Sequence, residues 1–106
     1  MEKEETLFAK AFGSTPKLKV LEFLIEERHK DHAISDIAAG AGVGRTTLFR
    51  IWDDLISHDI LKQTRSIGNA KLFRLNMQNP FVSHLVKLFD SHAKGKKEDK
   101  RIYYTG

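Results

Sequence analysis

A short apolar segment near the middle of the chain ends at a run of glycines, and a longer amphipathic segment follows it directly. This arrangement restricts the fold more than any other part of the sequence. Residues 36–40 have the spacing of a short helix, and the glycine-rich run 41–44 is poorly suited to continue it. A second helix is predicted from Arg45 to about His58, with apolar side chains at core spacing, namely Leu48, Ile51, Trp52, Leu55 and Ile56. Two helices joined by so short a turn must cross at close range.

A close crossing makes steric demands that these residues meet. Ala38 provides a small side chain where the two helices touch, and Gly42 supplies the left-handed backbone that the turn needs. Ser35 is placed to cap the first helix. Ile37 and Val43 fall where they would fix the pair to the body of the domain. The segment therefore predicts a pair of helices of which the second protrudes.

Three more helices are predicted around this pair. Residues 2–12 have an apolar stripe at helical spacing behind an acidic start. Thr15 as N-cap and Pro16 in the first turn mark the start of a helix that runs to about Arg28. A last helix is predicted over 80–92, again opening on a proline.

Between the protruding helix and the last helix, the sequence predicts a hairpin. Strands over 61–66 and 70–76 flank Gly68-Asn69, a pair that forms tight turns. The order is helix, helix, short helix, turn, helix, two-stranded hairpin, helix. A mainly α, α+β fold follows.

This combination resembles the winged helix-turn-helix family of transcription regulators, of the small MarR/ArsR-like bacterial and archaeal type. The resemblance lies in the run from Ser35 to Leu48 and in the hairpin region from Asp59 to Asn76. It implies a three-helix core with a two-stranded β-hairpin wing and additional terminal helices. The corresponding division is an N-terminal helix at 1–13, the DNA-binding domain at 14–76, a C-terminal helix at 77–92 and a basic flexible tail at 93–106.

The resemblance makes the helix that begins near Gly44 the recognition helix, whose N-terminal side chains face base edges in the major groove of double-stranded DNA. Arginine suits the paired acceptors of guanine, and threonine bonds to bases or phosphate or touches the thymine methyl. The alternative is that the arginines are solvated charges on an exposed helix face. The residues assigned to this helix are Arg45, Thr46, Thr47 and Arg50.

The hairpin supplies a second predicted contact with DNA. In similar domains the tip of the wing touches phosphate or the minor groove. The tip residues assigned to it are Arg65, Gly68, Asn69 and Lys71. Ile67 is unusual at a solvated turn, and it either packs on sugar edges or folds back on the hairpin.

Charge placement separates two classes of function. The net charge is +4, but residues 1–42 carry more acidic than basic side chains, and the excess of basic ones lies after residue 42. This placement favours a sequence-specific DNA-binding regulator. The alternative is a winged-helix adaptor that binds proteins and does not read DNA. The basic run 94–101 is either a solvated tail or an accessory attraction to DNA.

The terminal helices predict a homodimer. Their apolar stripes exceed what a three-helix core with a wing needs to bury, and a dimer would also set two recognition helices one DNA turn apart. The sequence does not identify an effector, the operator, or whether the protein activates or represses. The stripes are Leu7, Phe8, Ala11 and Phe12 in the first helix, and Phe81, Leu85, Leu88 and Phe89 in the last.

Other classes of protein are disfavoured. The chain has no cysteine, which excludes disulfides and thiolate zinc sites, and no apolar run approaches the roughly 20 residues of a membrane span. No nucleophile, base and orienting group form a set, so we expect neither an enzyme nor a cofactor. The five histidines are interpreted as surface residues rather than metal ligands, with His58 complementing the end of the protruding helix. A cytoplasmic, nucleoid-associated protein is expected.

Overall fold

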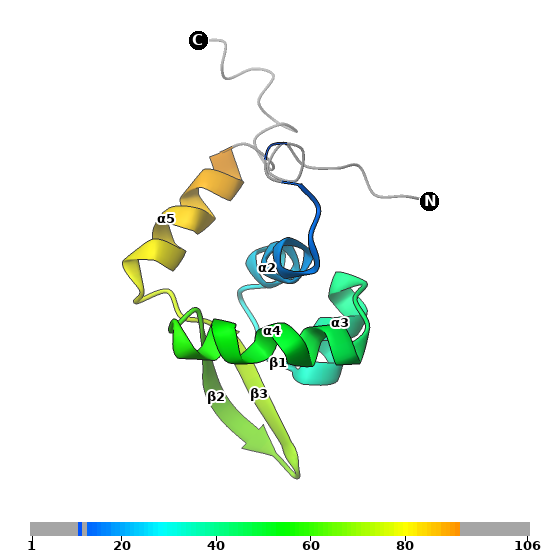
Figure 1. Ribbon diagram of the computed structural model, residues 1–106. Helices are drawn as coiled ribbons and strands as arrows, with labels where there is room; N and C mark the ends of the chain where they lie inside the picture. Colours follow the sequence, from blue (N-terminus) through cyan, green and yellow to red (C-terminus); the bar gives the residue numbers. More distant parts are fainter. Residues whose placement is uncertain (1–10, 12, 92–106) are drawn as a thin grey trace, which may run out of the picture.

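The computed structural model describes residue 11 and residues 13–91 of the protein (Figure 1). The predicted helix over 2–12 and the basic tail 93–106 fall almost entirely outside the described residues. Within them, the predicted order of helices and hairpin is confirmed, and the fold is α+β. The elements are α2 (Pro16–Glu26), β1 (His32–Ala33), α3 (Ile34–Ala41), α4 (Arg45–Ser57), β2 (Leu61–Ile67), β3 (Ala70–Leu75) and α5 (Pro80–Phe89).

Helix α2 begins as predicted and ends two residues early. The Thr15 hydroxyl accepts a hydrogen bond of 3.1 Å from the backbone N–H of Leu18, and Pro16 occupies the first turn, where its missing N–H costs nothing. The buried side of the helix consists of Val20, Leu24 and Ile25. These side chains form the centre of the core, over which the other helices lie.

The sheet has a third strand that the sequence analysis missed. Strand β1 pairs antiparallel with β3, which also pairs with β2, so the order is β1-β3-β2. His32 in β1 is only 8% exposed, so the surface interpretation is wrong for this histidine. Its Nε2 lies 3.0 Å from the carbonyl oxygen of Glu27, and its ring meets that of Phe23 edge-on at 5.1 Å. A two-residue strand is too short to show the alternation that identifies strands in a sequence.

Helix α3 starts one residue earlier than Ser35, so the prediction of Ser35 as N-cap is wrong. The N-cap is Ala33, which has an extended backbone because it is still paired in β1, and no side chain caps the helix. Ser35 lies exposed in the first turn. The helix runs one residue past the predicted end, to Ala41, and the turn is as predicted: Gly42 has a left-handed backbone (φ +73°), and the N–H of Val43 donates to the carbonyl of Ala38 at 3.0 Å.

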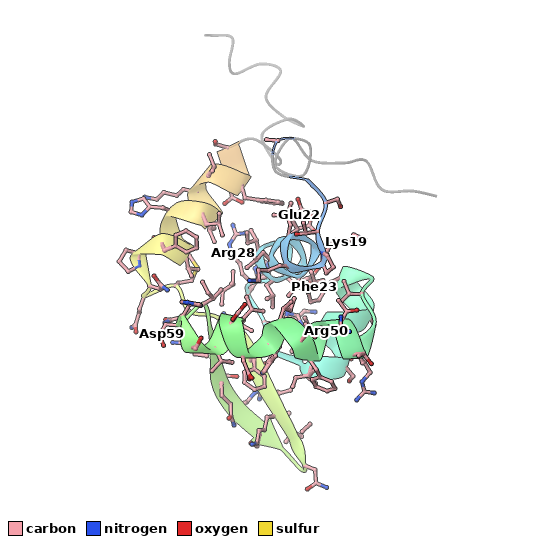
Figure 2. The ribbon with its side chains drawn as sticks, viewed as in Figure 1. Lys19, Glu22, Phe23, Arg28, Arg50 and Asp59 are labelled. Carbon is pink, nitrogen blue, oxygen red and sulfur yellow. The ribbon has the colours of Figure 1, made fainter. Side chains whose placement is uncertain are left out.

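The close packing of α3 on α2 depends on a second small residue, Gly40. A Cβ atom at this position would lie 2.2 Å from Cε1 of the Phe23 ring, far inside van der Waals contact. Figure 2 shows Phe23 on α2. Ala38, the small residue predicted from the sequence, is also buried, at 3% exposed. The close approach of α3 to α2 therefore needs the missing side chain of Gly40, in addition to the small Ala38 predicted where α3 meets α4.

Helix α4 leads into β2 through a left-handed residue. Asp59 has φ +58°, and the N–H of Ile60 donates to the carbonyl of Leu55 at 2.9 Å, the arrangement that usually has glycine at this position. The Asn79 side chain donates to the Asp59 carbonyl at 3.0 Å and also caps α5 by accepting from the N–H of Phe81. The start of α5 is thereby tied to the end of α4.

One hydrophobic core joins the helices to the base of the hairpin. Helix α5 contributes Val82, Val86 and Phe89 to it, and the Arg28–Asp90 ion pair (2.7 Å) links the end of α5 to the loop after α2. Figure 1 shows α4 crossing the molecule between α2 and the hairpin, which projects away from the helices. The projecting hairpin and the outer side of α4 are thus left on the same part of the surface.

Candidate nucleic-acid interface

The core determines which side of α4 faces outward. Leu48 and Leu55 are buried, and the ring of Trp52 packs edge-on against that of Phe73 in β3, with centroids 5.0 Å apart. These contacts fix the rotation of the helix about its axis, because residues three or four apart share a face. Ile56, predicted in the core, is 37% exposed, so that assignment is wrong. It lies beyond Leu55, where α4 is leaving the core.

The N-terminal half of α4 presents its predicted site residues to solvent. Arg45, Thr46 and Arg50 are exposed and Thr47 is partly buried. Within the part of the chain that the structure describes, neither arginine side chain has a hydrogen bond or an ion pair. Figure 2 labels Arg50 on this helix. Both cations are therefore available to a ligand, and the positive end of the helix dipole adds to their field.

The C-terminal half of α4 has the opposite character. Asp53 is exposed, and the Asp54 carboxylate pairs with Lys17 at 3.1 Å. His58 Nδ1 lies 2.8 Å from the carbonyl oxygen of Asp54, so the predicted role of His58 at the helix end is confirmed. An anion that approaches the outer side of α4 would meet attraction at the first two turns and repulsion further along.

The tip of the hairpin has the geometry predicted for a tight turn. Gly68 and Asn69 connect the paired residues Ile67 and Ala70, and Gly68 has φ +62°. A positive φ at the first central residue is typical of a type II′ turn. Ile67 is 58% exposed and does not fold back on the hairpin. Lys71 is exposed and has no ion pair with any residue that the structure describes.

Arg65 is held by a carboxylate that the sequence analysis did not connect with it. Its Nε donates to Asp31 Oδ2 at 3.0 Å and its Nη2 to Asp31 Oδ1 at 3.2 Å. The Thr64 hydroxyl donates to the same carboxylate at 2.5 Å. A bulge between Gln63 and Arg65 adds a residue to β2 at this point. The hairpin is therefore tied, near its middle, to the loop that precedes β1.

These contacts shift both pKa values. The hydrogen bonds from Arg65 and Thr64 hold the pKa of Asp31 well below its usual range, and the Asp31 carboxylate raises the pKa of Arg65. The Arg65 side chain is nevertheless 61% exposed, whereas that of Asp31 is 12% exposed. The Arg65 side chain thus remains largely open to solvent although Asp31 holds Nε and Nη2. No sequence pattern pairs two residues so far apart along the chain.

One outward residue of α4 was missed by the sequence analysis. Phe49 is 53% exposed, beside Arg50 on the polar side of the helix. The signal was present, since a core formed by Leu48, Ile51 and Leu55 leaves position 49 outside it.

The described residues offer neither a metal site nor a membrane-spanning helix. No group of three or more His, Asp or Glu side chains in 13–91 is arranged to hold a metal ion. No helix described by the structure is long and apolar enough to cross a membrane. The outer side of α4 and the hairpin remain the principal candidate surface.

Solved structures resemble this chain in fold. No family model and no curated protein matches it. A homodimeric winged helix-turn-helix DNA-binding domain from Mycobacterium bovis, a possible ArsR-family transcriptional regulator, aligns with a TM-score of 0.55 and 23% identity over 78% of this chain and 71% of that one. The antimony-specific transcriptional repressor AntR aligns with a TM-score of 0.55 and 22% identity over 77% and 69%.

A third similar structure contains nucleic acid. The transcriptional repressor CouR, bound to a 23-mer DNA duplex, aligns with a TM-score of 0.55 and 14% identity over 92% of this chain and 69% of its own. Identities of this order establish the fold alone. The chain has the winged helix-turn-helix fold, with α3 and α4 as the helix-turn-helix pair and β2–β3 as the wing.

Proposed function

We propose that the protein binds double-stranded DNA in a sequence-specific manner and regulates transcription. The observation that carries the proposal is that Arg45 and Arg50, on the outward N-terminal half of α4, have no ion pair with any residue that the structure describes. In this fold, that part of the helix is the one that enters the major groove. Arg45, Arg50, Thr46 and Thr47 would face base edges or adjoining phosphates, with the arginines suited to guanine. Such a protein acts on the chromosome and is expected in the nucleoid of the cytoplasm.

In this proposal the wing contacts the DNA backbone or the adjacent minor groove. Lys71 would bind a phosphate directly, the backbone at Gly68 would approach closely because glycine has no side chain, and the Asn69 amide would donate to a phosphate or a base edge. Arg65 would reach a phosphate with its solvent-facing edge while Asp31 holds the other edge. The Asp31 carboxylate would then orient the guanidinium and would not compete with the DNA phosphate for it.

We also propose that the protein acts as a homodimer through its terminal helices. The similar domain from Mycobacterium bovis is homodimeric. In this chain α5 buries Val82, Val86 and Phe89 in its own core, and it leaves Phe81 59% exposed. Met77, just before the helix, is 45% exposed. A second copy that covers these side chains would place two recognition helices about one DNA turn apart.

The dimer is tested by sedimentation velocity at micromolar concentration. The wild-type chain should sediment as a dimer, and Phe81→Glu should sediment as a monomer, because it would place a charge in the covered surface. Lys87→Glu, a charge reversal at an exposed position of the same helix, is the control and should change the oligomeric state less than Phe81→Glu does. A wild-type monomer contradicts the dimer.

DNA binding is tested by selecting duplexes from a random pool and measuring their affinity at two salt concentrations. Arg45→Ala and Arg50→Ala should each lower the affinity for the selected duplex by about ten- to a hundredfold and change the sequence that is selected. Lys19→Ala removes an exposed cation of α2 (Figure 2) and should leave the selected sequence unchanged. If both arginine variants bind the wild-type sequence with wild-type affinity, α4 is not the reading element.

A further inference from the structure

An aromatic ring stands among polar groups on the outward side of α4. Phe49 is 53% exposed, with Arg45 one turn before it and Arg50 directly after it. Its ring makes no aromatic contact with the described residues. Apolar surface in water is unfavourable, and more than half of the surface of this residue is left exposed. The residue is thus suited to a contact outside the chain.

The position of Phe49 places its ring beside the arginines of the candidate DNA-binding surface. Phe49 lies three residues before Trp52, so the two residues are neighbours on the surface of α4. Trp52 packs on the base of the wing, and Phe49 lies one turn closer to the N-terminal end of the helix. It therefore belongs to the same two turns of the helix as Arg45, Thr46 and Arg50. A ligand that covers these arginines must also approach the ring.

The surroundings of Phe49 favour a small apolar target within an anionic surface. In the described residues, the other large exposed hydrophobic side chains lie elsewhere: Ile56 two turns along α4, Ile67 at the wing tip, and Met77, Phe81 and Leu88 near or on α5. A single ring with Arg45 one turn before it, Arg50 beside it and Asp53 one turn after it does not make the apolar centre of a protein interface. The major groove of DNA offers a matching target, because thymine places its C5-methyl group there between phosphate backbones.

We propose that Phe49 is a specificity-determining residue that contacts the C5-methyl group of a thymine in the recognition sequence. This inference rests on the proposed binding of DNA by α4 and adds to it a base that the arginines and threonines do not determine. The arginines would fix the helix in the groove, and the ring would exclude water from the methyl group. Replacement of that thymine by cytosine or deoxyuridine then removes the contact.

The test uses the duplex selected by the wild-type protein and the same duplex with one thymine at a time replaced by deoxyuridine. Deoxyuridine pairs as thymine does and lacks only the methyl group. At one position of the half-site, the wild-type protein should bind the deoxyuridine duplex about fourfold more weakly, the size expected for one buried methyl-sized group. Phe49→Ala should bind the two duplexes equally.

Controls separate this inference from the proposed function. Phe81→Ala removes a phenylalanine of similar exposure (59%) from α5, away from α4, and should keep the fourfold ratio, whatever it does to overall affinity. Because Phe49 is exposed, the thermal unfolding of Phe49→Ala should match the wild type. If the protein binds DNA through Arg45 and Arg50 but ignores every replacement of thymine, or selects a sequence without thymine, this inference alone is overturned. If it binds no duplex, both are overturned.

Discussion

Helix α4 and the wing lie on the same part of the surface, yet different forces hold them in place. The helix is fixed by Leu48 and Leu55, which are buried in the core. Beyond its base the wing contributes no buried side chain, and every residue of β2 after Leu61 is exposed. Besides the backbone pairing of β3 with β1, the middle of the wing is held by the polar contact of Arg65 and Thr64 with Asp31.

Because different forces hold them, α4 and the wing should respond to different perturbations. Hydrophobic burial is nearly independent of pH and of moderate salt, so the orientation of α4 should persist wherever the domain is folded. An ion pair weakens when its carboxylate is protonated and when salt screens it. The wing should therefore lose its orientation first, while α4 keeps presenting Arg45 and Arg50.

The largest effect is expected from removing the anchor of α4. Leu48 is completely buried, and Leu48→Ala should lower the free energy of unfolding by about 2–5 kcal/mol, through lost burial and the cavity left behind. The neighbouring change Phe49→Ala is the control, with an expected effect within about 0.5 kcal/mol because the ring is exposed. Urea unfolding followed by circular dichroism measures both. Equal losses for the two variants would mean that α4 is rotated differently on the core.

A smaller loss is expected where α3 meets α2. Gly40→Ala forces a methyl group onto the Phe23 ring, at a cost of about 1–3 kcal/mol, against a gain in helix propensity of roughly 1 kcal/mol. We expect a net loss of about 1 kcal/mol in the free energy of unfolding. Ala39→Gly is the control, since Ala39 is exposed in the same helix and its replacement changes the helix propensity alone. An unchanged stability of Gly40→Ala would show that the Phe23 ring moves aside freely.

Much of the fold was predictable from local patterns. Core spacing gave the buried side of α4, Thr15 and Pro16 gave the start of α2, and Gly42 gave the turn. Strand β1 was missed because two residues carry no periodicity, and the Ser35 cap failed because that strand runs directly into α3.

The candidate site was predictable in part. The exposure of Arg45 and Arg50 followed from the core positions between them. The partner of Arg65 did not, because Asp31 is brought to it by the pairing of β1 with β3 rather than by proximity along the chain. Contacts of this kind depend on the tertiary fold, and no local pattern encodes them.

Acid should act on the wing contact before it acts on α4. The pKa of Asp31 is lowered in the folded state, so its contribution to stability is fully present above the unfolded pKa of about 4 and is lost as the pH falls below that value. Asp31→Asn should therefore be less stable than the wild type at pH 7, and the difference should shrink as the pH is lowered from 5 toward 2. Urea unfolding at several pH values measures this difference.

The control for this pH dependence is Asp53→Asn. Asp53 is exposed and has no ion pair with the described residues, so its replacement should change stability little at any pH. A difference between Asp31→Asn and the wild type that stays constant from pH 7 to pH 2 would contradict the ion pair as the element that holds the wing.

The smallest effect concerns the contribution of the wing to DNA binding. Each phosphate neutralised by a cation steepens the dependence of log K on log salt by about 0.9. Lys71→Ala should reduce this slope by about that amount, and Arg65→Ala should do the same because its solvent-facing edge would reach a second phosphate. Lys19→Ala, on α2, should leave the slope unchanged. Fluorescence anisotropy titrations from 50 to 200 mM salt measure this slope. An unchanged slope for both Lys71→Ala and Arg65→Ala would mean that α4 contacts DNA and the wing does not.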